Sequence, residues 1–120
     1  MPKHNAMIAA YLDERSSALL YQTMADVEQD PRLAEVYRRI SATETGHANR
    51  WAEKAKADGI IVPEFKPSWR TRTLARLAKR FGPAMILPAI QNMERTGIAD
   101  YSGMADAKTM KGEEQSHSRL

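Results

Sequence analysis

A glutamate followed three residues later by a histidine occurs twice in this sequence, as Glu44 with His47 and as Glu114 with His117. Residues three apart on an α-helix lie on the same face, one turn from each other, and can bind one metal ion together. A single pair of this kind is common on solvated helix surfaces. Two such pairs, which use two of only three histidines, favour a helical protein with a shared metal centre.

The first pair follows a helical segment that carries a glutamate inside its apolar seam. In residues 6–27 this seam repeats at steps of four and three residues and consists of Met7, Tyr11, Glu14, Ala18, Tyr21 and Ala25. Glu14 stands where a purely structural helix would carry leucine. Glu94 has the same setting before the second pair, between Ile90 and Ile98. We therefore expect Glu14 and Glu94 to be additional metal ligands.

The turn after residue 27 places the first glutamate opposite the first pair. Asp30 is a suitable N-cap and Pro31 a suitable first residue for a second helix, which should end just before Gly59. Glu14 and Glu44 lie at about the same distance from this turn, so an antiparallel hairpin brings them level. The inward face expected for the second helix consists of Leu33, Val36, Tyr37, Ile40, Glu44, His47 and Trp51.

A second hairpin is expected in the C-terminal part of the chain. Glu94 and Glu114 lie at similar distances from the break at residues 102–103, so they too should stand level. The chain is therefore interpreted as a divergent internal repeat of two helical hairpins. Residues 59–82 are long enough for the crossover that joins such hairpins in a four-helix bundle.

The crossover is expected to contain a short basic helix over residues 69–81, with Ser68 as its N-cap and Gly82 and Pro83 at its end. Its apolar side consists of Leu74, Leu77, Ala78 and Phe81, and its basic residues are Arg70, Arg72, Arg76, Lys79 and Arg80. Such a run indicates a solvated surface, an anionic membrane surface or a nucleic-acid surface. No nucleic-acid-binding motif accompanies it, and Trp69 near its start favours the membrane among the binding functions.

Four glutamates and two histidines suit two divalent ions. Iron or manganese fits these oxygen and nitrogen donors better than copper does, and zinc could substitute. Four buried carboxylates would repel one another, and two divalent cations would cancel their charge. Tyr21 and Tyr101 each follow a predicted ligand by seven residues, so each is either a core aromatic or a hydrogen-bond partner of a ligand carboxylate.

Composition excludes several other classes of protein. The 120 residues contain no cysteine, which rules out disulfides and thiolate metal sites. No apolar run is long enough to span a membrane, and the N-terminus lacks the apolar region of a signal peptide. The formal charge of +3 is modest, although the pI of about 9.3 is compatible with anionic partners.

These residues resemble the ferritin-like superfamily in its rubrerythrin-like branch, and in particular the N-terminal domain of the erythrin–vacuolar iron transporter family, the membrane-bound ferritins of bacteria. Besides the ligand pattern, the matching features are Tyr21 seven residues after Glu14, Trp51 four residues after His47, the junction at residues 80–83, and the final segment at residues 116–120. The resemblance implies an all-α, ferritin-like four-helix bundle over residues 6–120. From the sequence itself, residues 1–5 are expected to be a disordered segment before it.

By analogy with that family, two iron ions would be bridged by Glu44 and Glu114, and the other four ligands would each bind one ion. The implied activity is oxidation of iron(II) by dioxygen or peroxide, or iron capture ahead of export, for iron detoxification. The implied location is the cytoplasmic face of a bacterial membrane. There the domain would feed or regulate a transmembrane iron exporter that would follow the present chain.

Three alternatives remain open at this point. They are a rubrerythrin-like peroxidase, an iron-sensing module without turnover, and a structural bundle or membrane adaptor without metal. Rubrerythrins have a cysteine-ligated iron centre and a further glutamate where this chain has Gly97, and both differences count against the peroxidase. A homodimer is also expected, because the shorter second hairpin would leave Leu19, Leu20 and Met24 exposed.

Overall fold

The computed structural model describes residues 2–92, with the side chains of residues 6–92, and this part of the chain is helical without any strand. Its helices are α1 (Pro2–Val27), α2 (Pro31–Ala57), α3 (Trp69–Phe81) and a 3₁₀ turn, η1 (Pro83–Met85). Residues 87–92 are again helical. The predicted all-α class is thus confirmed for the described residues. The expected second hairpin, with Glu94, Tyr101, Glu114 and His117, lies outside them.

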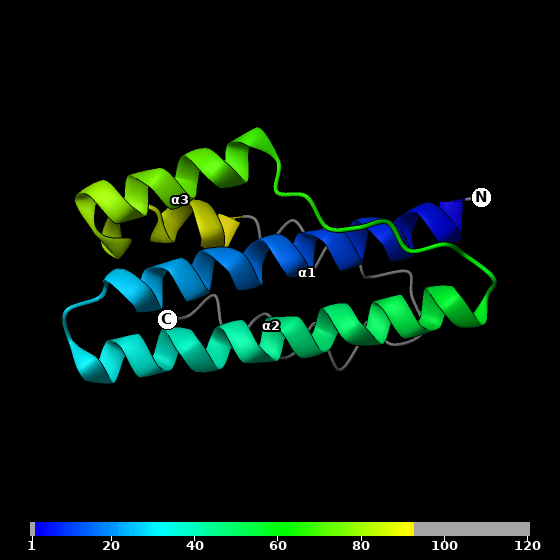
Figure 1. The fold of residues 1–120 in the computed structure, drawn as a ribbon, viewed down its shortest axis with the longest axis horizontal. Coiled ribbons are helices and arrows are strands. Elements are labelled where there is room, and N and C mark those ends of the chain that lie inside the picture. The colour runs from blue at the N-terminus through cyan, green and yellow to red at the C-terminus, as the bar shows by residue number, and fades with distance from the viewer. Residues whose placement is uncertain (1, 93–120) are drawn as a thin grey trace.

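Helices α1 and α2 form a long antiparallel hairpin and lie side by side along their lengths (Figure 1). Asp30 caps α2 as predicted, since its carboxylate accepts a hydrogen bond of 2.9 Å from the backbone N–H of Arg32. At the other end Gly59 adopts a left-handed backbone conformation with φ of 78°. These local signals explain why the predicted bounds of α2 are confirmed to within a residue.

Helix α1 begins earlier than the sequence pattern indicated. It starts at Pro2, so residues 2–5, which we expected to be disordered, belong to the helix. Proline is favoured at the first helical position, because its fixed φ suits a helix and its missing N–H would have no intrahelical partner there. We predicted the helix from Ala6, and it starts four residues, about one turn, earlier.

After α2 the chain runs back along the hairpin as an extended connector, residues 58–68, and then forms α3, which packs against α1 (Figure 1). Ser68 caps α3 as predicted, because its Oγ accepts a hydrogen bond of 3.2 Å from the backbone N–H of Thr71. Gly82, with φ of 96°, ends the helix. We also expected the third helix of the bundle to start at Gly82 and Pro83, and it does not start there. The 3₁₀ turn η1 comes first, and Pro88 then falls in the first turn of the helix at residues 87–92.

The core consists of two apolar clusters with a polar layer between them. One cluster contains Met7, Ala10, Tyr11, Ala48, Trp51 and Ala55. The other contains Leu20, Tyr21, Met24, Ala25, Tyr37, Ile40, Ala78, Ile86 and Ile90. The polar layer contains the buried residues Glu14, Ser17, Ser41, Glu44 and His47. All six predicted seam residues of α1 are buried, which confirms that pattern.

Two residues that we expected on the inward face of α2, and one that we expected on the apolar side of α3, are exposed. Leu33 and Val36 are 38% and 36% exposed, because the buried seam of α2 passes through Ala34 and Tyr37 and continues at steps of three and four residues. Phe81, the last residue of α3, is 58% exposed.

Leu20 and Met24, whose expected exposure was the reason for predicting a homodimer, are not exposed. Leu20 and Met24 are fully buried within the chain, in the cluster that includes Ile86 and Ile90. Leu19, the third residue that we expected to be exposed, is half-buried, and the homodimer stays a prediction. Within residues 2–92, no helix combines the length and the apolar character needed to cross a bilayer.

Candidate metal centre

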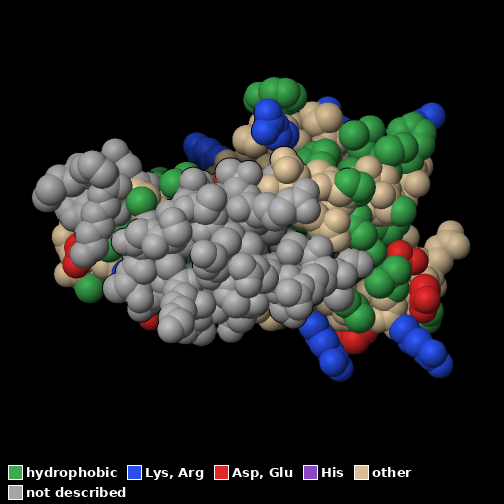
Figure 2. All heavy atoms as spheres, turned by 180° about the vertical axis from the view of Figure 1, so that it is seen from behind, with side chains coloured by type: hydrophobic (Ala, Val, Ile, Leu, Met, Phe, Trp, Pro, Cys, Tyr) green, Lys and Arg blue, Asp and Glu red, His purple; other side chains and the backbone are tan. Residues whose placement is uncertain are grey.

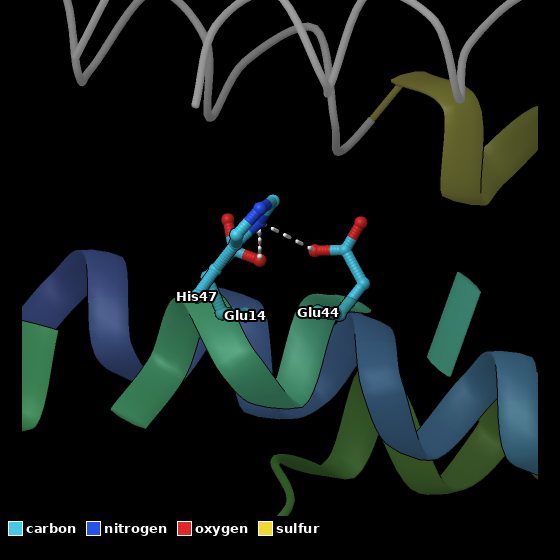
Figure 3. A group of neighbouring side chains, drawn as sticks. All are labelled: Glu14, Glu44 and His47. Atoms are coloured by element: carbon cyan, nitrogen blue, oxygen red, sulfur yellow. Dashed lines mark hydrogen bonds and ion pairs between the residues drawn. The ribbon is translucent and has the colours of Figure 1, made fainter. Parts of the chain in front are cut away.

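Glu14 of α1 and Glu44 and His47 of α2 meet on one side of the α1–α2 hairpin (Figure 3). One potential ligand atom from each residue lies within 4.8 Å of the other two. Nδ1 of His47 is 3.2 Å from Oε2 of Glu14 and 3.9 Å from Oε2 of Glu44. The hairpin therefore brings together two carboxylates and one imidazole, which are donors that divalent metal ions accept.

The convergence follows from two simple features of the sequence. Glu44 and His47 lie three residues apart on α2, so their side chains leave the same face one turn from each other. Glu14 comes from α1 at the same level, because the α1–α2 turn lies about midway between Glu14 and Glu44 in the sequence. The predicted meeting of these three residues is what the structure contains.

All three side chains are withdrawn from solvent, with exposed fractions of 3% or less. Burying a carboxylate costs on the order of several kcal/mol unless an opposite charge and hydrogen bonds compensate. His47 lies within ion-pair distance of both glutamates and, when protonated, offsets one negative charge. A divalent cation would offset both, so the chemistry of this donor set fits a metal ion.

The surroundings hold the three side chains in place. The two apolar clusters lie on either side along the hairpin, so the ligands project from rigid, well-packed helices. Within the polar layer, the hydroxyl of Ser41 donates a hydrogen bond of 2.7 Å to the backbone carbonyl of Ala18 and joins α2 to α1. This contact fixes the spacing of the helices one turn from Glu44.

Tyr21 is fully buried, and its ring packs at 6.2 Å and 41° against the ring of Tyr37. It thus belongs to the apolar cluster, as one of our two interpretations had it. Its role as a hydrogen-bond partner of a ligand carboxylate stays a prediction, and Tyr101 lies outside the described residues. The other predicted ligands, Glu94, Glu114 and His117, also lie outside this range.

Sequence reasoning missed a contact beside the site. The guanidinium of Arg15, the residue after Glu14, donates a hydrogen bond of 2.9 Å to the hydroxyl of Tyr11 and lies 4.7 Å from the centre of the Phe65 ring. Arg15 and Phe65 line an open groove of about 430 Å³ between α1, α2 and the connector. None of the three candidate ligands lines this groove. Its formation depends on the path of the connector, which no local signal determines.

Comparisons of the chain with protein-family models, with curated proteins and with solved structures find no match. The resemblance to the ferritin-like superfamily therefore rests on the sequence pattern. The candidate metal centre rests on the geometry of Glu14, Glu44 and His47. That geometry supports binding of one divalent ion by three protein side chains, with coordination positions left for solvent or a second ligand.

Proposed function

We propose that this domain binds iron(II) at Glu14, Glu44 and His47 and oxidises it. The observation that carries the proposal is the convergence of two carboxylates and an imidazole in the buried polar layer of the α1–α2 hairpin. A structural core would place apolar side chains at these seam positions. Metal binding explains why two glutamates and a histidine stand there instead.

The donor set supports iron among the common metals. Carboxylate oxygens and an imidazole nitrogen suit iron(II) and manganese(II), whereas copper(I) prefers thiolate and thioether sulfur. The chain contains no cysteine that could supply a thiolate. Zinc accepts the same ligands without changing its oxidation state, which makes it a useful inert substitute.

A second ion would be bound by the remaining predicted ligands, Glu94, Glu114 and His117, with Glu44 and Glu114 as bridges. Iron is the substrate in this proposal. Two iron(II) ions give up one electron each, and dioxygen accepts both electrons with two protons to leave as hydrogen peroxide. If hydrogen peroxide is the oxidant, it accepts two electrons and two protons and becomes two water molecules.

The residues of this chain would contribute charge and position. Glu14 and Glu44 would attract iron(II) and stabilise the more highly charged iron(III) after oxidation, because carboxylates bind the higher charge more tightly. His47 would bind through a ring nitrogen in its neutral form. By the resemblance, the oxidised iron would then be removed by an attached exporter at the cytoplasmic face of a bacterial membrane, as iron detoxification.

Aerobic titration with iron(II) tests this proposal. We expect wild-type protein to oxidise many equivalents of iron(II), followed by the absorbance of iron(III) and by oxygen consumption. Glu14→Gln should lose most of this activity, whereas Glu53→Gln should keep it, since Glu53 is exposed on the same hairpin. Stoichiometric binding without turnover would indicate an iron-sensing module, and peroxide-selective turnover would indicate a peroxidase. Absence of iron binding would refute the proposal.

A further inference from the structure

We infer that the outward face of α3 is a docking surface for an anionic lipid bilayer. The first observation is a segregation of charge along the chain. Residues 65–92 contain six basic residues and no acidic one. The remaining residues contain twelve basic and fifteen acidic residues, so their formal charge is −3. Positive charge is therefore concentrated in the segment that contains α3.

The structure places this charge on one face. Thr71 and Ala78 are buried on the inner side of α3, which packs against α1. The opposite face consists of the exposed residues Trp69, Arg72, Thr73, Arg76, Lys79 and Arg80. Trp69, Thr73, Arg76 and Arg80 recur at steps of four, three and four residues, which forms one continuous stripe. Among the described residues, no ion pair joins a basic side chain of α3 to a carboxylate.

Large exposed apolar side chains lie at both ends of α3. Trp69, Phe81 and Met85 are 70%, 58% and 56% exposed, whereas the other tryptophan, Trp51, is 1% exposed. Seen from behind, hydrophobic side chains gather over the α3 end of the molecule, and basic side chains project at its edge (Figure 2). Tryptophan is favoured at the boundary between lipid headgroups and hydrocarbon, where its ring and its N–H are both accommodated.

These features favour a bilayer over a nucleic acid. Both partners offer phosphate to the basic stripe, but a bilayer also offers an apolar layer beneath the phosphates, which Phe81 and Met85 can enter. The inner side of α3 is already used against α1, so the helix would not insert as a whole. It would bind by charge, with Trp69 and Phe81 reaching the headgroup level from its two ends.

The two tryptophans allow a direct test with vesicles. Trp69 is exposed and Trp51 is buried, so a blue shift of the emission on binding reports on Trp69, and Trp69→Phe should remove it. We expect the shift and co-sedimentation with vesicles of phosphatidylcholine mixed with phosphatidylglycerol. Phosphatidylcholine vesicles alone should give neither, and high salt should reverse both.

A matched pair of triple variants tests whether vesicle binding depends on the outward face of α3 or only on the net charge of the protein. Replacement of Arg72, Arg76 and Arg80 by glutamine should lower vesicle affinity on the order of 100-fold. Replacement of the exposed residues Arg32, Arg50 and Lys56 by glutamine removes the same charge and should lower it only a few-fold. Far-UV circular dichroism checks that both variants are folded. Three results would overturn the inference. They are equal losses of affinity in the two variants, no binding of the wild type to anionic vesicles, and release of the protein from vesicles by duplex DNA at an equal phosphate concentration.

Discussion

Nδ1 of His47 on α2 lies 3.2 Å from Oε2 of Glu14 on α1, and both side chains are buried in the middle of the hairpin. This contact joins residues that are 33 positions apart in the sequence. It shows that the two arms of the hairpin are in register at the polar layer.

Metal binding should stabilise the folded chain through Glu14. At a free manganese(II) concentration of 100 times the dissociation constant, the free energy of unfolding of the wild type should rise by about 2.7 kcal/mol. Glu14→Gln should lose most of this gain, because it removes one charged ligand, and Glu53→Gln should retain it. Thermal unfolding with manganese(II) and with a chelator measures the difference. An equal gain in wild type and Glu14→Gln would contradict the assignment of Glu14.

Leu20 and Leu33 should respond differently to truncation. Leu20 is fully buried, so Leu20→Ala should lower the free energy of unfolding by about 2–5 kcal/mol. Leu33 is 38% exposed, so Leu33→Ala should cost about 1 kcal/mol or less. Urea unfolding of the two variants compares them directly. The opposite order would mean that the buried seam of α2 runs through Leu33, as the sequence pattern suggested.

The N-cap residue of α3, Ser68, should contribute measurably to the stability of the chain. Ser68→Ala removes the acceptor of the Thr71 N–H and should destabilise the chain by about 1 kcal/mol. Ser68→Asp supplies another good cap and should restore most of the loss. Urea unfolding followed by circular dichroism is the appropriate measurement. If Ser68→Asp were as unstable as Ser68→Ala, the hydrogen bond at this position would not be the cause.

Tyr37 should ionise at unusually high pH. Burial, and to a smaller extent the negative charge of Glu28, raises the pKa of Tyr37 above its ordinary value of 10.0. Because the folded pKa exceeds the unfolded one, the associated stability is fully present below pH 10 and is lost as pH rises through the folded pKa. The difference in tyrosinate absorbance between wild type and Tyr37→Phe measures this ionisation. A midpoint at or below pH 10 would contradict it.

The sequence was most informative where local chemistry decides the structure. Asp30 and Ser68 accept hydrogen bonds from the first turns of α2 and α3, and Gly82 ends α3 with a positive φ that glycine adopts most readily. The same holds for the meeting of Glu14 with Glu44, since it depends only on helical rise and on the position of one turn. These features could be predicted because each involves a short stretch or a simple length comparison.

The errors arose where distant segments decide which side chains are covered. Leu20 and Met24 were expected to be exposed, but Ile86 and Ile90 cover them from far along the chain. The contact of Arg15 with Phe65 depends on the course of the connector beside α1. Helical periodicity indicates which residues share a face, and it does not indicate which segment packs on that face.

The central claim is that Glu14, Glu44 and His47 hold a metal ion together. Crystals grown or soaked anaerobically with iron(II), with diffraction data collected on both sides of the iron absorption edge, test it most directly. The account predicts an anomalous peak in contact with all three side chains, and its loss in Glu14→Gln crystals. Iron found only elsewhere, with His47 still hydrogen-bonded to Glu14, would contradict it.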